Sequence, residues 1–135
     1  MTREHGQATV FVLGMSLVCF AVAGVAVDGT RAFILRRTLQ NAADASALAG
    51  ASELDRHALY ADGRVVLDQA KARGAAARWL TERGIVADVA IDVTGNQVRV
   101  LVRDRVNATF LTLVGIDVLP VGAEARAAPV AGAPE

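Results

Sequence analysis

The chain has 135 residues with 14 basic and 14 acidic side chains, and 53 % of its residues are hydrophobic although only 4 % are aromatic. A neutral chain without a basic block offers no electrostatic footprint for nucleic acid, so we expect no nucleic-acid partner. Its single cysteine, Cys19, excludes an intramolecular disulfide.

Residues 7–27 carry no charged side chain. At about 1.5 Å per residue, a helix of this length reaches roughly 30 Å and can cross the hydrocarbon core of a bilayer. In lipid its backbone groups bond within the segment, and the hydroxyls of Thr9 and Ser16 can bond carbonyls one turn back. The segment therefore predicts a transmembrane helix surrounded by membrane lipid.

Two rival interpretations concern processing of this segment. A cleaved secretory signal would use Arg3 as its positive end, residues 8–20 as its apolar region, and a cleavage site after Ala23 or Ala26. The helical pattern continues past both sites, which favours a permanent anchor. A lipoprotein site at Cys19 is disfavoured because Val18 stands where a small residue is expected, so burial of Cys19 as a small hydrophobe is the better interpretation.

The charges that flank the apolar segment predict its orientation. Arg3 lies on one side, and Arg31, Arg36 and Arg37 lie on the other. Counting positive charges alone would place the carboxyl side in the cytoplasm.

The helical pattern continues from Asp28 to Ala51 without a helix breaker. Small residues form two rows at four-residue spacing: Ala42, Ser46 and Gly50, and beside them Ala43, Ala47 and Ala51. Rows of small residues allow another helix to approach closely, although alanine is also the best helix former. We expect a helical partner for this rod.

Asp28 is the ionisable residue that stands where the apolar segment ends. It either marks the membrane interface or pairs with an arginine of a neighbouring membrane helix.

The rest of the chain predicts a small α+β domain. Residues 53–64 are a polar connector, residues 65–83 have a helical pattern ended by Gly84, and residues 85–93 and 98–103 alternate as strands around a tight turn at Gly95-Asn96. A short helix is expected at 107–115, and an edge strand at 116–127 because Pro120 cannot donate to a ladder. The predicted division is 1–52 for the transmembrane and extended helix, 53–64 for the connector, 65–127 for the domain and 128–135 for a disordered tail.

The fold class expected is therefore α+β. A long transmembrane helix continues into an extracytoplasmic helix, and a small domain follows with one helix against an antiparallel sheet of about three strands. His5, His57 and Cys19 form no credible metal set, and the sequence has no phosphate loop, nucleophile elbow or zinc pattern. We expect no catalytic residues, no cofactor and no enzymatic activity.

Several segments together resemble the amino-terminal region of the TadE/TadG-like Flp pilus-assembly proteins. They are residues 3–11, 23–29 and 37–51, together with Arg31. The carboxyl half is similar in style to actinobacterial members. The resemblance implies a bacterial envelope protein of the tight-adherence system, with its amino terminus inside and its domain outside the cytoplasmic membrane, against the charge count.

In prepilin-like relatives the chain is cut after a glycine that a glutamate follows five residues later. Gly6 occupies the glycine position, but Phe11 replaces the glutamate, so Gly6 is only a weak processing candidate.

The expected function is that of a membrane-anchored, minor pilin-like assembly component. Its expected partners are pilin-like or Tad assembly-platform proteins, or a second copy of the chain. The residues proposed for this interface are Asp28, Arg31, Ala42, Ala43, Ser46, Ala47 and Gly50. The alternative is a secreted small binding domain released by signal peptidase.

Overall fold

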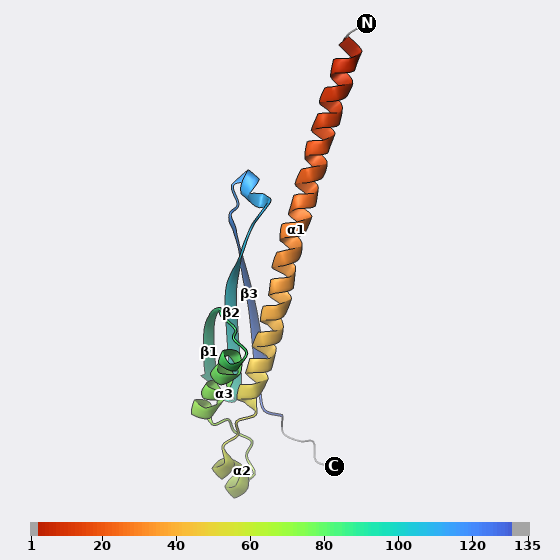
Figure 1. Ribbon diagram of the computed structural model, residues 1–135. Helices are drawn as coiled ribbons and strands as arrows, with labels where there is room; N and C mark the ends of the chain where they lie inside the picture. Colours follow the sequence, from red (N-terminus) through yellow and green to blue (C-terminus); the bar gives the residue numbers. More distant parts are fainter. Residues whose placement is uncertain (1–2, 131–135) are drawn as a thin grey trace. The chain divides into compact units, whose positions relative to one another are not determined.

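The computed structural model describes residues 3–130, which form three α-helices, three strands and one 3-10 helix (Figure 1). The helices are α1 (Arg3–Ala51), α2 (Arg56–Asp62) and α3 (Gln69–Glu82). The strands are β1 (Asp88–Thr94), β2 (Gln97–Asn107) and β3 (Val118–Ala127), and the 3-10 helix η1 (Leu111–Val114) lies between β2 and β3. The predicted α+β class, with one helix packed on a three-stranded antiparallel sheet, is confirmed.

Helix α1 runs without a break for 49 residues. Its sequence contains no proline, and Ser16 Oγ donates to the carbonyl of Val12 at 2.8 Å, as predicted for a hydroxyl in an apolar helix. The helix from Gly6 onward is long and apolar enough to cross a membrane, although a signal sequence would pass the same test. The apolar segment and the helical stretch that was predicted to continue it thus form a single helix.

The predicted connector contains a helix of its own. Asp55 caps α2 by accepting from the backbone N–H groups of His57 and Ala58 at 2.9 and 3.2 Å. Gly63, at φ +63°, ends the helix in the left-handed conformation that suits glycine. With only seven residues, α2 is too short to produce a clear periodic pattern in the sequence.

Helix α3 begins later than its pattern predicts. Asp68 is its N-cap and accepts from the backbone N–H of Lys71 at 3.2 Å, so the helix starts at Gln69 rather than near Val65. Gly84, at φ +64°, follows its last residues as expected.

The sheet has the order β1-β2-β3, which makes β3 an edge strand, as the proline at position 120 predicts. Thr94 pairs with Gln97, so Gly95 and Asn96 form the two-residue hairpin turn, and positive φ occurs at Gly95. The short helix expected at 107–115 is shorter than predicted: β2 continues to Asn107, and only Leu111–Val114 form a helix, the 3-10 helix η1.

The chain divides into two compact units, each described by itself. One contains the residues up to Ile34 with Arg105–Leu119, and the other contains Leu35–Asp104 with the residues from Pro120 onward. The predicted division into rod, connector, domain and tail stays a prediction, and residues 131–135 of that tail lie outside the described residues.

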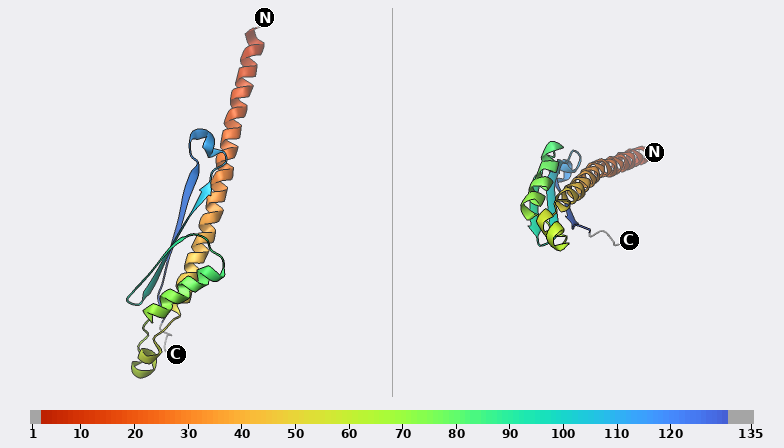
Figure 2. Two further views of the ribbon diagram at one scale, coloured as in Figure 1. Left: turned by 60° about the vertical axis from the view of Figure 1, so that its left-hand side comes forward. Right: turned by 90° about the horizontal axis from the view of Figure 1, so that it is seen from below.

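The core of the second unit forms where α1, α3 and the sheet meet. In β2 the side chains of Val98, Val100 and Val102 are fully buried and alternate with more exposed residues. Figure 2 shows α3 beside the β1–β2 hairpin. Helices α1 and α3 supply mainly small side chains to this core: Ala42, Ala43, Ala47, Ala72 and Ala76, with Leu39 and Leu80.

Candidate functional site

Asp28 is fully buried, and its carboxylate binds the backbone of the turn that connects β2 to β3, far along the chain. The N–H of Thr109 lies 3.0 and 3.1 Å from the two carboxylate oxygens, and the N–H groups of Phe110 and Leu111 donate to Oδ2 at 2.8 Å each. Three consecutive backbone donors thus converge on one side chain. All of these residues belong to the first compact unit.

The need for such an acceptor comes from the local structure of the turn. The first N–H groups of a helix have no partner within it, and Phe110, the N-cap of η1, makes no side-chain capping bond. A carboxylate suits this position, because charge-assisted bonds to backbone N–H groups are stronger than neutral ones. Asp28 therefore does for η1 what a local capping residue does for an ordinary helix.

Arg31 binds the same turn from the next helical turn of α1. Its Nη1 donates to Thr109 Oγ1 at 2.8 Å. Since Arg31 lies three residues after Asp28, the two side chains share one face of α1. The pair thus holds Thr109 through both its backbone and its side chain.

Gly24 allows α1 and the turn to come close together. A Cβ atom built on Gly24 would lie 2.5 Å from Cβ and 2.7 Å from Cγ of Phe110, distances that real Cβ atoms do not show. The absence of a side chain at Gly24 is therefore what allows Phe110 to contact the helix.

The small-residue rows proposed as an interface are covered by the chain itself. The side chains of Ala42, Ala43, Ser46 and Ala47 are buried in the second unit. A Cβ on Gly50 would lie 2.9 Å from the carbonyl oxygen of Ala72 and 3.1 Å from Val98 Cγ1. The close approach that the rows predict is thus made by α3 and β2, and an interface with another protein at these residues stays a prediction.

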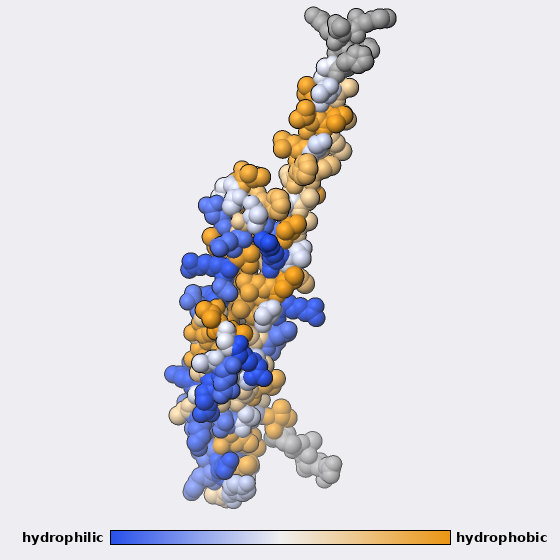
Figure 3. Space-filling model, viewed as in Figure 1, coloured by the Kyte–Doolittle hydropathy of each residue, from blue (hydrophilic) through white to orange (hydrophobic). Residues whose placement is uncertain are grey.

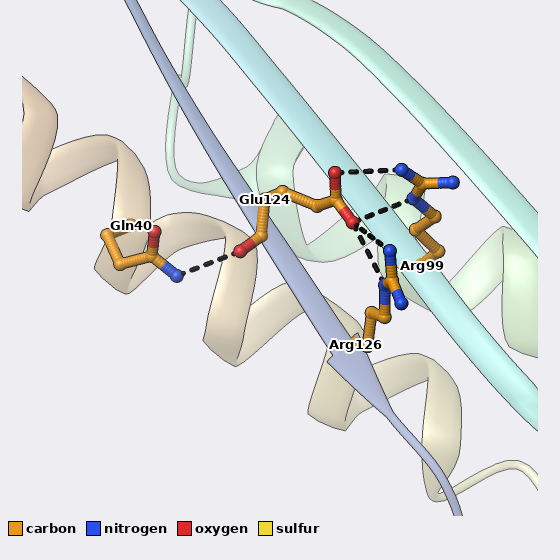
Figure 4. A network of polar contacts seen from close by, with 4 residues as sticks. All are labelled: Gln40, Arg99, Glu124 and Arg126. Carbon is orange, nitrogen blue, oxygen red and sulfur yellow. Dashed lines mark hydrogen bonds and ion pairs between the residues drawn. The ribbon is translucent and has the colours of Figure 1, made fainter.

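A polar network fixes β3 to β2 and to α1 within the second unit (Figure 4). Arg99 donates from Nε and Nη2 to the two oxygens of Glu124 at 2.9 and 2.8 Å, and Arg126 Nε donates to Glu124 Oε1 at 2.9 Å. Gln40 Nε2 donates to the backbone carbonyl of Glu124 at 3.1 Å. The hydrogen bonds from Arg99 and then Arg126 hold the pKa of Glu124 below its ordinary value.

Asp28 was expected either to mark the membrane interface or to pair with an arginine of a neighbouring membrane helix, and both stay predictions. The structure adds a contact within the chain, because the Asp28 carboxylate accepts from three backbone N–H groups. The one sequence signal was an acidic residue at the end of an uncharged run. Connecting Asp28 to Thr109 requires the fold, because 81 residues separate them.

The other candidate residues make few contacts. Gly6 is exposed, with nothing within 4 Å of a Cβ built on it, and Cys19 is exposed rather than buried within the chain. Within residues 3–130, no group of three or more His, Cys, Asp or Glu side chains could hold a metal ion.

The fold defines a small α+β protein whose first helix has an exposed, uncharged amino-terminal stretch and a buried carboxyl-terminal one. Residues 6–53 match the family model described as "Putative Flp pilus-assembly TadE/G-like", which confirms the family resemblance over this part of the chain. Proteins of this family are associated with the cell envelope, have protein partners in the Tad system and are in general not enzymes. No curated protein and no solved structure matches the chain.

Proposed function

We propose that the protein is a membrane-anchored, minor pilin-like component of Flp pilus assembly in the tight-adherence system. It acts by protein contacts, without catalysis or a cofactor. The observation that carries this proposal is the unbroken α1 helix, whose exposed, uncharged stretch lies inside the segment that matches the family model. The uncharged stretch is the single membrane span, and the domain that follows Asp28 faces the extracytoplasmic side of the cytoplasmic membrane.

The proposed orientation places three arginines outside the cytoplasm, whereas the count of positive charges would place them inside it. Arg31 is held by Thr109 within the first unit, so this cation belongs to a folded turn rather than to a free flanking segment. Arg36 and Arg37 are exposed on the same continuous helix. Charges on a folded segment that leaves the membrane as a unit carry less weight than charges on a short loop.

Partner proteins contact α1 through side chains that the chain itself leaves exposed. Phe33, Ile34 and Leu48 are large, apolar and more than half exposed, and by helical periodicity they lie on one side of α1. The partner is a pilin-like or assembly-platform helix, or a second copy of the chain. A partner at the buried rows would first have to displace β2 or α3.

Neighbouring positions on α1 provide a matched crosslinking test of this interface. In a Cys19→Ala background, Leu48→Cys carries a thiol on the exposed side and Ala47→Cys carries one on the buried side. In cells that assemble pili, we expect a crosslink from Leu48→Cys to a pilin-like or assembly protein, or to a second copy, and none from Ala47→Cys.

Two other crosslinking outcomes would contradict this interface. Capture from Ala47→Cys alone would move the interface to the small-residue rows. Uncrosslinked monomer from both variants, while pili assemble, would overturn the proposal of assembly through α1.

Release by signal peptidase is the alternative, and the intact mass of the mature protein distinguishes it. Loss of the first 23 or 26 residues would support a secreted binding domain. The anchored protein instead keeps residues 7–27, fractionates with membranes and exposes its carboxyl-terminal domain to protease added from outside. The contact of Gly24 with Phe110 favours an intact helix, because cleavage at either site would require α1 to unwind there.

A further inference from the structure

The turn that Asp28 holds exposes large apolar side chains. Between Phe110 and Ile116 the sequence has no charged residue. The side chain of Leu113 is 86 % exposed, and those of Val114, Phe110 and Ile116 are also exposed. Exposed apolar groups gathered in one short turn indicate contact with something other than water.

The turn lies alongside the uncharged part of α1. Together they line an apolar groove of about 220 Å³, whose walls are Leu17, Phe20, Ala21 and Val25 of α1 with Phe110, Leu111, Leu113 and Val114 of the turn. At about 1.5 Å per residue, Leu17 lies roughly 16 Å before Asp28 along the helix. Figure 3 shows hydrophobic atoms of the turn beside those of α1. The turn therefore occupies the same depth as part of the proposed membrane span.

Entry into lipid requires that backbone donors be satisfied within the protein. Asp28 accepts from three consecutive N–H groups at the start of the turn. The N–H groups of Leu113, Gly115 and Ile116 donate to carbonyls within the turn at 3.0–3.1 Å. A short segment of 3-10 helix and turn with these donors paired can lie at membrane depth at low cost.

Charged groups lie at the base of the turn. Asp28 and Arg31 bind Thr109, and Asp117, which is exposed, directly follows Ile116. These residues mark a polar level next to the apolar turn, as expected where lipid headgroups meet acyl chains.

We propose that the Phe110–Ile116 turn inserts beside α1 into the membrane leaflet next to Asp28, as a second lipid-contacting element whose occupant is the acyl chains. The inference rests on the proposed function, because α1 must span the membrane. The groove is lined by apolar side chains and lies alongside the uncharged part of α1, which favours acyl chains as its occupant.

Fluorescent labelling of the full chain in phosphatidylcholine–phosphatidylglycerol vesicles tests the inference. A nitrobenzoxadiazole dye is placed on Leu113→Cys or Val86→Cys, each in a Cys19→Ala background, or on native Cys19. Val86 is the matched control, because it is 90 % exposed and Leu113 is 86 % exposed. Quenching by spin-labelled acyl chains reports lipid contact, and reduction by external dithionite reports contact with water.

We expect the Leu113→Cys dye to be quenched by spin-labelled lipid and to react with dithionite at least tenfold more slowly than the Val86→Cys dye. If the Leu113→Cys dye behaves like the Val86→Cys dye while the Cys19 dye is quenched by lipid, the insertion is wrong and the anchor stands. If the Cys19 dye is not quenched by lipid, the membrane anchor itself fails. Protection of the Leu113→Cys dye from both reagents would indicate a protein in the groove and overturn lipid as its occupant.

Asp28→Asn provides a second measurement. The amide keeps the shape but replaces one acceptor oxygen with a donor, so the turn is held less tightly to α1. The Leu113→Cys dye should then react several-fold faster with dithionite, while the Cys19 dye remains in lipid. An unchanged Leu113→Cys dye in this variant would show that Asp28 does not hold the turn in the membrane.

Discussion

Between Val10 and Val27 the side chains of α1 are mostly large, apolar and exposed, whereas between Leu39 and Ala51 the side chains that α1 buries are almost all small. Both stretches belong to one continuous helix. Large side chains suit acyl chains, which adapt to any shape, whereas small ones allow a neighbouring backbone to approach closely. Side-chain size thus separates a helix surface suited to lipid from one suited to protein more clearly than hydrophobicity does.

The largest effect on the free energy of unfolding is expected in the protein core. Val98→Ala removes two methyl groups from a fully buried side chain, so we expect a loss of about 2–3 kcal/mol in the free energy of unfolding. Val12→Ala makes the same change on the exposed stretch of α1 and should change this free energy by less than about 0.5 kcal/mol. Chemical denaturation in detergent micelles, followed by Trp79 fluorescence, measures both. Val98 lies in β2 and packs against Gly50 of α1, so equal losses would contradict the assignment of this core and the exposed stretch of α1 to different surroundings.

A smaller and local effect is expected at the contact between α1 and the turn. Gly24→Ala places a methyl group against Phe110, and overpacking of this kind typically costs about 1–3 kcal/mol. Amide hydrogen exchange at residues 109–111 should accelerate about tenfold or more, which corresponds to about 1.4 kcal/mol. Gly29→Ala is the control, because nothing lies within 4 Å of a Cβ at that position. Similar exchange in both variants would mean that Phe110 does not rest on Gly24.

The smallest effect concerns pH and the Glu124 network. Because the pKa of Glu124 is lowered in the fold, its contribution to stability is present above the ordinary glutamate pKa and is lost as the pH falls through the folded value. The difference in Tm between the wild-type protein and Glu124→Gln should therefore be constant near neutral pH and shrink below about pH 4.3. Glu82→Gln removes the same charge from an exposed position and should show a flatter profile. A Tm difference for Glu124→Gln that does not change with pH would rule out this linkage.

Local signals in the sequence were sufficient for much of the fold. Residues 7–51 predict one helical rod because no breaker interrupts them, Gly95-Asn96 predicts the hairpin because few residues fit a two-residue turn, and Pro120 predicts an edge strand. Helix α2 was not predicted within the polar connector, because a seven-residue helix ends before a hydrophobic period can repeat.

The candidate site was harder to predict, because its parts meet only in the folded chain. The rows that contain Ala43 and Gly50 predict that a neighbour comes close, but they do not tell whether that neighbour belongs to the same chain. The position of Asp28 at the end of the apolar segment makes it a candidate. Its role as an acceptor depends on three backbone N–H groups whose location only the fold reveals. The exposed side chain of Leu113 resembles an ordinary turn residue until the turn is seen beside Leu17 and Val25.

The separation of Asp28 from Thr109 along the chain has a consequence for biosynthesis. Asp28 leaves the ribosome 81 residues before Thr109, and at about 5–20 residues per second this interval lasts roughly 4–16 s. During that time α1 is completed, but the carboxylate has no turn to bind and must remain hydrated. Synthesis of β2 and the residues after it then brings the N–H donors, so one aspartate serves first as a polar end of the apolar segment and only later as a structural acceptor.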